Sequence, residues 1–145
     1  MGAVSVEQIL VTPLKRIQLS EGDVLHALKR GDSGYVHFGE AYFSMIGAGT
    51  VKAWKRHLRM TLNLVVPQGA VQFVFMDEQG AMREEVVGVQ AGRYVRLTVP
   101  PGIWFGFKGL FGPHSMLMNV ADIHHDPAEI ERKGLAEIEF DWENR

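Results

Sequence analysis

Short β-type segments separated by glycine and proline turns run along almost the whole sequence. By pattern we count roughly seven to ten of them, and chains with so many short segments fold as antiparallel sandwiches or barrels. We therefore predict an all-β fold. The segments that we expect to be strands lie at residues 35–45, 51–66, 70–77, 84–90, 94–99, 103–107, 115–124 and 138–142.

Three segments depart from this pattern. Residues 20–30 carry a helix signature, because Ser20 can cap an acidic first turn and Lys29 and Arg30 close the last turn. We also expect a helical turn at residues 128–133. Residues 7–17 contain Pro13, which is incompatible with a central strand, so this segment is predicted to be an edge strand or an extended arm.

The stretch from residue 51 to residue 77 organises the chain, and a turn at residues 67–69 divides it into two β-type runs. Because side chains alternate along a strand, one face of the first run is expected to be polar and the other apolar. A barrel wall beside a wet pocket has this character, and so does the solvated face of an ordinary antiparallel sheet. The polar face would hold Lys55, His57, Arg59, Thr61 and Asn63, and the apolar face Leu62, Leu64 and Val66.

Composition is that of a single-domain globular protein. The 145 residues suffice for one core, the net charge of −2 gives no reason to expect a nucleic-acid or membrane partner, and the absence of cysteine excludes disulfides. No segment reaches the roughly 18 apolar residues that span a bilayer, and the N-terminus lacks a secretory signal. We expect one domain over residues 1–145, with an arm at 1–19, a barrel from about 35 to 142, and a cytoplasmic location.

Four blocks of sequence resemble the cupin superfamily, and within it the dTDP-4-dehydrorhamnose 3,5-epimerases and the related dTDP-sugar 3,4-ketoisomerases. Residues 52–57 stand where the family has Arg-Gly-x-His followed by Tyr-Gln or Ala-His, and residues 64–77 resemble its central hairpin. Residues 99–107 resemble Ile-Pro-x-Gly-Phe-Ala-His-Gly-Phe, and residues 140–142 resemble its terminal tryptophan strand.

The resemblance implies a cupin jelly-roll barrel, also called a double-stranded β-helix, that forms a homodimer. It further implies an epimerase or isomerase that acts on a nucleotide-linked 4-keto-6-deoxy sugar by removing a proton beside the ketone, in surface polysaccharide biosynthesis. A non-catalytic cupin that binds a sugar nucleotide or a carbohydrate is the alternative. No cofactor is expected.

Metal binding is not expected either. Metal-binding cupins use two histidines one residue apart, a glutamate, and a later histidine. The corresponding positions hold Lys55 and His57, then Thr61 or Leu62, and finally Phe105. One imidazole beside an ammonium and a phenyl ring does not hold a transition metal. The site should therefore be metal-free, as in the sugar epimerases that the chain resembles.

The catalytic positions of the family are also altered. The histidine base, the enolate-stabilising lysine and the tyrosine acid of the epimerases correspond to Lys55, Leu62 and Asn119, whereas His57 retains the second histidine of the ketoisomerase pair. A lysine in a partly desolvated pocket can work as a base, and histidine titrates near neutrality. We take His57 as the preferred acid/base and Lys55 as a second base or enolate stabiliser.

Several other polar and aromatic residues are candidate substrate contacts. Trp104 can stack on a base or a sugar, or belong to the core as large aromatic residues usually do. Basic side chains can hold a diphosphate. The predicted substrate-binding residues are Glu40, Tyr42, Lys52, Arg59, Asn63, Trp104 and Asn119.

Overall fold

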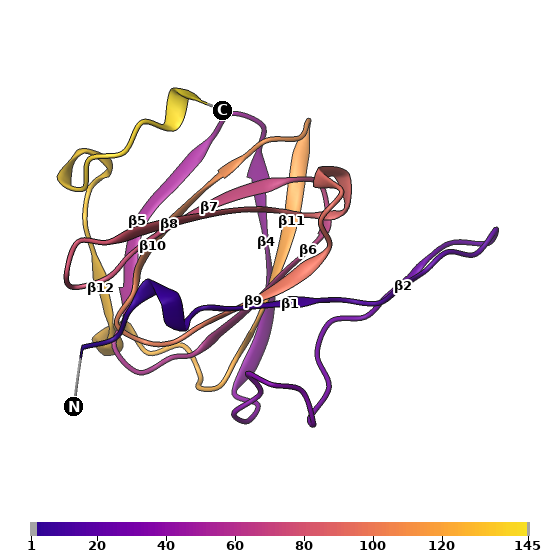
Figure 1. Cartoon of the computed structure of the whole chain (residues 1–145), viewed down its shortest axis with the longest axis horizontal. Helices are drawn as coiled ribbons and strands as arrows, with labels where there is room; N and C mark the ends of the chain where they lie inside the picture. Colours follow the sequence, from indigo (N-terminus) through magenta and orange to yellow (C-terminus); the bar gives the residue numbers. More distant parts are fainter. Residues whose placement is uncertain (1–2, 145) are drawn as a thin grey trace.

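Two five-stranded antiparallel sheets form the body of the molecule, which the computed structural model describes from residue 3 to residue 144 (Figure 1). The first sheet has the order β1 (Leu10–Pro13), β9 (Val95–Val99), β6 (Leu62–Gln68), β11 (His114–Ala121) and β4 (Glu40–Gly47). The second has the order β12 (Ile130–Arg132), β5 (Val51–His57), β10 (Trp104–Gly109), β7 (Val71–Met76) and β8 (Met82–Val87). The all-β prediction and the jelly-roll expectation are confirmed.

Helical structure within residues 3–144 is limited to single 3-10 turns. These are η1 (Val6–Gln8), η2 (Val89–Ala91), η3 (Pro127–Glu129), η4 (Leu135–Glu137) and η5 (Trp142–Asn144). No helix in the described part of the chain is long and apolar enough to cross a bilayer.

The hydrophobic core lies between the two sheets. Leu64 of β6, Phe73 and Phe75 of β7, and Leu97 of β9 are almost fully shielded from solvent there. Burying a side chain of this size contributes about 1.5–3 kcal/mol to the free energy of folding. Because successive side chains of a strand point to opposite faces, this gain decides which face of each strand turns toward the core. A second cluster covers the opposite face of the second sheet and contains Trp54, Val74, Trp104, Ile138 and Trp142.

The N-terminal segment behaves as predicted only in part. Strand β1 pairs with β9 and forms one edge of the first sheet, so the edge-strand prediction for residues 7–17 is confirmed for residues 10–13. The helix predicted at residues 20–30 is wrong. That region contributes to a two-stranded hairpin, β2 (Arg16–Ile17) with β3 (Val24–Leu25), which extends away from the barrel in Figure 1.

The polar side chains that suggested a helix stabilise this hairpin instead. One Asp23 oxygen accepts a hydrogen bond from Nε of Arg16 at 2.8 Å, and the other accepts from the backbone N–H of Leu19 at 3.4 Å. Gly22 sits between the strands with a φ of 137°, a conformation that glycine adopts readily. Asp23 therefore serves a tight turn rather than a helix N-terminus.

The central stretch contains a break that the sequence pattern hides. Strand β5 ends at His57, the chain bends, and β6 begins at Leu62. The alternation of side chains is therefore not continuous from Lys55 to Asn63, and the prediction that these residues share a face is wrong. The turn predicted at residues 67–69 is confirmed only at Gly69, because β6 continues through Gln68 and the chain turns at Gly69 and Ala70 before β7 begins.

The C-terminal segment differs from the prediction in two places, residues 130–132 and residues 138–142. Residues 130–132, expected to lie in a helical turn, form β12 and pair with the edge of β5. Residues 138–142, expected to be a strand, are irregular up to the 3-10 turn η5. They stay in place because Trp142 packs on Trp54, with ring centroids 5.5 Å apart, and the buried Lys108 ammonium donates to the Trp142 carbonyl at 2.7 Å.

Candidate active site

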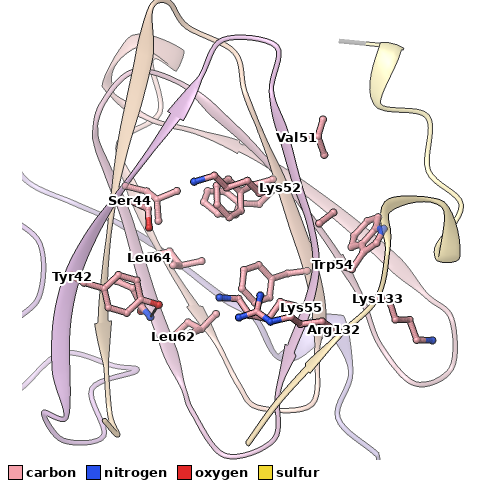
Figure 2. Close-up of a pocket in the computed structure, with 16 residues that line it drawn as sticks. Tyr42, Ser44, Val51, Lys52, Trp54, Lys55, Leu62, Leu64, Arg132 and Lys133 are labelled. Atoms are coloured by element: carbon pink, nitrogen blue, oxygen red, sulfur yellow. Dashed lines mark hydrogen bonds between the residues drawn. The ribbon is translucent and has the colours of Figure 1, made fainter. Parts of the chain in front are cut away.

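A cavity of about 440 Å³ opens between the two sheets (Figure 2). Strands β4, β6 and β11 supply one wall, and β5, β7, β10 and β12 supply the other. Its apolar lining is Val51, Ala53, Trp54, Leu62, Leu64, Phe73, Phe105, Phe107 and Leu117; its polar lining is Tyr42, Ser44, Lys52, Lys55, Asn119, Arg132 and Lys133. A mostly apolar cleft with a few convergent polar groups is the usual form of a small-molecule site.

The charge of this lining is one-sided. Four of its residues are cationic, of which Lys133 directs its ammonium outward to Trp104, and no aspartate or glutamate belongs to the lining among the described residues. Fields of one sign in a cleft with apolar walls attract ligands of the opposite charge. The cavity therefore suits an anionic small molecule.

Lys55 lies on β5 directly opposite Phe105 of β10 on one side and Arg132 of β12 on the other. Burial lowers the pKa of the Lys55 ammonium, and the charge of Arg132 lowers it further, against an opposing contribution from Glu129. Within residues 3–144 no hydrogen bond to the Lys55 ammonium is present, and the side chain points into the cavity in Figure 2. A desolvated lysine of this kind can act as a base.

Strand β10 reaches this position through a local irregularity. Its register with β5 shifts between Phe105 and Gly106. A Cβ atom added to Gly106 would approach the Cβ of Ala53 to 2.5 Å, so only glycine allows the two strands to pass this closely. The shift keeps Phe105 opposite Lys55 and makes the phenyl ring part of the cavity wall.

Tyr42 enters the cavity from the facing sheet. It lies on β4, opposite Asn119 of β11, and its phenol oxygen accepts a hydrogen bond from Nδ2 of Asn119 at 3.1 Å. Asn119 is itself fixed, because its side-chain oxygen accepts from the backbone N–H of Asn63 at 3.0 Å. The Tyr42 hydroxyl keeps its proton free to donate toward a ligand.

His57 lies behind this wall rather than in it. Its side chain is 4% exposed, its ring stacks on Phe105 with centroids 6.2 Å apart, and it does not line the cavity. Nδ1 of His57 is 2.6 Å from the buried carboxylate of Glu129. Burial lowers the pKa of His57, while the hydrogen bond to Glu129 opposes that shift.

Glu129 remains the charged member of this pair. Burial alone would raise its pKa, but the hydrogen bond from His57 and those from the backbone N–H groups of Arg59 and Met60 lower it overall. The neutral imidazole then donates Nδ1–H to the carboxylate and leaves Nε2 as an acceptor. In the described part of the chain this buried Nε2 atom has no hydrogen-bond partner.

The structure brings together only some of the residues that the sequence singled out. Lys55, Lys52, Tyr42 and Asn119 line the cavity, and His57 is immediately behind Phe105. The Nζ atom of Lys52 donates to the carbonyl of Met45 at 2.9 Å, which ties β5 to β4 across the cavity mouth.

The other four predicted substrate contacts lie elsewhere. Asn63 faces Thr98 and the loop at Gly34, with its side-chain oxygen 2.6 Å from Oγ1 of Thr98. Trp104 belongs to the outer cluster, where Arg56 and Lys133 each lie 4.9 Å from the centre of its ring. Glu40 accepts from the backbone of His125, and the exposed Arg59 pairs with Asp126 at 2.9 Å beside a separate shallow depression.

Sequence reasoning missed four polar residues of this region. Ser44, Arg132 and Lys133 line the cavity, and Glu129 holds His57. Ser44 could have been predicted from the sequence, because it follows Tyr42 by two residues and therefore shares its face of β4. Glu129, Arg132 and Lys133 gave no local signal, since only the pairing of β12 with β5 places them at the site.

Comparisons with known proteins extend this picture. No protein-family model matches the sequence. The chain is 33% identical to a dTDP sugar isomerase from Desulfovibrio desulfuricans of known crystal structure, with a TM-score of 0.89 over 97% of this chain and 94% of the other. It is also 31% identical, over 86 residues, to the probable low-salt glycan biosynthesis epimerase Agl13 of Haloferax volcanii; that match spans 54% of each chain, about half of the curated relative's length.

A third similarity concerns the fold alone. The sugar 3,4-ketoisomerase QdtA from Thermoanaerobacterium thermosaccharolyticum, as a mutant in complex with TDP-4-keto-6-deoxyglucose, matches with a TM-score of 0.75 at 13% identity, over 89% of this chain and 90% of that one. The similarity to the Desulfovibrio isomerase is stronger, because it combines substantial identity with almost complete coverage of both chains. The chain therefore belongs to the cupin family of dTDP-sugar isomerases and epimerases.

Proposed function

We propose that this protein epimerises or isomerises a nucleotide-linked 4-keto-6-deoxy sugar by removing a proton from a carbon beside the ketone, in the biosynthesis of a surface polysaccharide. Membership of the dTDP-sugar isomerase and epimerase family supports the reaction class. The single observation that carries the mechanism is the position of Lys55, a desolvated amine inside a cation-lined cavity with no hydrogen-bond partner among the described residues.

The proposed reaction begins when the neutral Lys55 amine accepts the proton from the α-carbon. The C–H electron pair becomes the new C=C bond of an enolate, and the ketone oxygen takes the negative charge. The cationic lining stabilises that charge, because a low-dielectric cavity strengthens such interactions. Return of a proton to the same carbon from the opposite face inverts it. Delivery of the proton to the former ketone carbon moves the ketone instead, when the hydroxyl proton on the neighbouring carbon passes to the enolate oxygen.

Tyr42 is the proposed donor from the opposite sheet. Its hydroxyl already accepts the hydrogen bond from Asn119, so its own proton is directed elsewhere. Lys55 and Tyr42 come from facing walls of the cavity, and a sugar ring between them would meet an amine on one side and a phenol on the other (Figure 2). This arrangement matches the need for a base and an acid on opposite faces of the carbon.

His57 is proposed as a supporting acid/base. It follows Lys55 by two residues on β5, and its buried Nε2 carries a free lone pair. Because Phe105 separates the ring from the cavity wall, direct contact with substrate requires a movement of that phenyl ring. We therefore assign the primary base to Lys55 and a secondary role to His57.

A binding protein without catalysis remains the second candidate, and one observation favours it. Leu62 lines the cavity as an apolar side chain at the position where the resembled epimerases carry their enolate-stabilising lysine. A protein that has lost this cation and keeps the pocket would bind the sugar nucleotide and leave it unchanged.

Solvent deuterium incorporation separates the two candidates. The protein is incubated with dTDP-4-keto-6-deoxyglucose in D2O, and the sugar nucleotide is then analysed by mass spectrometry and proton NMR. These measurements detect proton removal even if the equilibrium favours the substrate and little product accumulates. Incorporation beside the ketone supports the enzyme. Binding of the sugar nucleotide, measured by calorimetry, without any incorporation supports the binding protein.

Three further properties belong to the same proposal. We infer a metal-independent reaction, a homodimer and a cytoplasmic location. The β2–β3 hairpin extends from the barrel and exposes Leu19 and Val24, which suits contact with a second copy of the chain. Light scattering at micromolar concentration is expected to give the mass of a dimer, and the mass of a monomer would contradict the proposed homodimer.

The proposed cytoplasmic location rests on composition. The absence of cysteine is compatible with a reducing compartment, and cell fractionation tests the location.

A further inference from the structure

Arg132 and Lys55 form a cross-strand pair of like charges. In the antiparallel register of β12 and β5 the two residues are direct partners, and both line the cavity. Figure 2 shows the guanidinium of Arg132 beside the Lys55 side chain, between the two walls of the cavity. Like charges directly opposite each other on neighbouring strands are destabilising, so this pair departs from what stability alone would favour.

Nearby acidic groups offset the pair only in part, because Glu129 opposes the effect of Arg132 on Lys55 while its own oxygens are bound elsewhere. Glu131 turns to the other side of β12 and pairs with Arg56. Glu129 is already bound by His57 and by backbone N–H groups. The groups that face Lys55 from each neighbouring element are Arg132 of β12, Glu129 of η3, Lys52 and His57 of β5, Tyr42 of β4, Asn119 of β11 and Phe105 of β10.

The backbone prevents the two cations from moving apart by separation of the strands. Trp54 and Lys133 exchange both backbone hydrogen bonds, at 2.9 and 3.0 Å, directly beside the pair. The indole N–H of Trp54 also donates to the carbonyl of Leu135 at 3.2 Å. The segment that carries Arg132 is therefore fastened to the strand that carries Lys55, although the Arg132 side chain is itself exposed at the cavity mouth.

We propose that Arg132 is a positioning residue whose fixed charge favours the unprotonated form of the Lys55 amine in the empty site and so helps to set the pH range in which the protein removes a proton from its substrate. This inference rests on the proposed function for its catalytic consequence. Its physical content, the control of the charge state of Lys55 by Arg132, holds independently of any substrate.

Loss of the Arg132 charge should therefore shift Lys55 toward its ordinary behaviour. Arginine stays charged throughout the accessible pH range, so its field acts on Lys55 at every pH. Replacement of Arg132 by a neutral residue raises the pKa of Lys55, because one of the three causes that lower it, which are burial, Arg132 and Lys52, disappears. Burial persists in the variant, so the pKa should remain below that of a free lysine.

The direct test is a titration of Lys55 by NMR in the protein without ligand. Lysines are labelled with 13C at Cε, the Lys55 signal is assigned by its absence in Lys55→Met, and its chemical shift is followed against pH. In Arg132→Gln the midpoint should rise by about half a pH unit or more at low ionic strength, and the difference should shrink in high salt, because Arg132 is exposed. Arg132→Lys, which keeps the charge, should stay close to the wild type.

Arg56→Gln is the matched control. It removes the same charge from the neighbouring position on β5, but that side chain faces Trp104 and Glu131 outside the cavity. The Lys55 midpoint should not move in this variant. If Arg132→Gln fails to fold, Arg132→Met gives the same readout with a side chain that keeps the apolar stem.

The catalytic consequence has its own readout. In Arg132→Gln the rise of deuterium incorporation with pH should move to higher pH by the same amount as the Lys55 midpoint, so that activity recovers in alkaline buffer. An unchanged Lys55 midpoint overturns the inference whether or not the protein is active. If the Lys55 midpoint shifts in Arg132→Gln but the wild type never incorporates deuterium into its substrate, the effect of Arg132 on Lys55 stands and the proposed function is refuted instead.

Discussion

Nδ1 of His57 lies 2.6 Å from Oε1 of Glu129, and both side chains are sealed from solvent, at 4% and 2% exposure. The second carboxylate oxygen accepts from the backbone N–H groups of Leu58, Arg59 and Met60, at 3.0, 3.1 and 3.4 Å. One buried glutamate thus fixes both the histidine at the end of β5 and the bend that leads into β6. This is the bend that interrupts the side-chain alternation of the central stretch.

Glu129→Gln should therefore destabilise the fold. An amide of the same shape keeps at most one of the two acceptor oxygens, so a buried N–H group or Nδ1–H loses its partner. Loss of hydrogen bonds to a buried charged group lowers the free energy of unfolding by about 2–3 kcal/mol, which urea denaturation would measure. Glu131→Gln removes a half-exposed carboxylate two residues away and should cost less than about 1 kcal/mol. Equal losses in the two variants would contradict the structural role of Glu129.

The fold followed from the sequence because its signals are local. Glycine and proline turns mark most strand boundaries; the run before residues 67–69 became β5 and β6, and the run after them became β7. The failed helix at residues 20–30 shows the limit of such signals. Asp23 and Gly22 suit a helix start and a tight turn equally well, and the short strand pairing between Arg16–Ile17 and Val24–Leu25 decides between them.

The site was predictable only where its residues are close in sequence. Lys55 and Lys52 lie on one strand, and Tyr42 and Asn119 were found through the resemblance. Glu129 is 72 positions from His57, and Arg132 meets Lys55 through the pairing of β12 with an edge of β5. Neither contact produces a periodic pattern of residues that could be recognised in the sequence. Asn63 and Trp104 were misplaced for a related reason, since their orientation depends on the bend at residues 58–61 and on the outer cluster.

Stability should depend on pH through Lys55. The pKa of Lys55 is lowered in the folded protein, first by burial and then by Arg132, so the unfolded chain binds the proton more tightly. Across the interval between the folded and the unfolded pKa the free energy of unfolding contributed by this residue rises with pH. Lys55→Met removes this ionisable group and with it the cost of its lowered pKa, so the variant should be more stable than the wild type at neutral pH, and the difference should narrow toward about pH 10.

Urea denaturation of both proteins across this pH range measures the effect. Lys15→Met serves as the control, because Lys15 is exposed and should show no such dependence. A Lys55→Met variant that is less stable than the wild type at neutral pH would show that the lysine stabilises the fold, which contradicts the stability cost that its lowered pKa implies.

The purified protein should contain no stoichiometric transition metal. The prediction rests on the cupin ligand positions, where only His57 could coordinate a metal, and that imidazole already donates to Glu129. Elemental analysis of protein prepared without chelator measures the content directly. Treatment with EDTA should leave deuterium incorporation unchanged. A full equivalent of bound metal, lost together with activity on chelation, would refute the metal-independent mechanism.

Deuterium incorporation into dTDP-4-keto-6-deoxyglucose by wild type, Lys55→Ala, His57→Asn and Lys15→Ala tests the central claim most directly. Proton removal by Lys55 predicts incorporation beside the ketone in the wild type and in Lys15→Ala, a loss of about 100-fold or more in Lys55→Ala, and a smaller loss in His57→Asn. Nucleotide binding should change little in Lys55→Ala, because the amine acts on the sugar. Full activity in Lys55→Ala, or a wild type that binds the sugar nucleotide without any incorporation, would contradict the account.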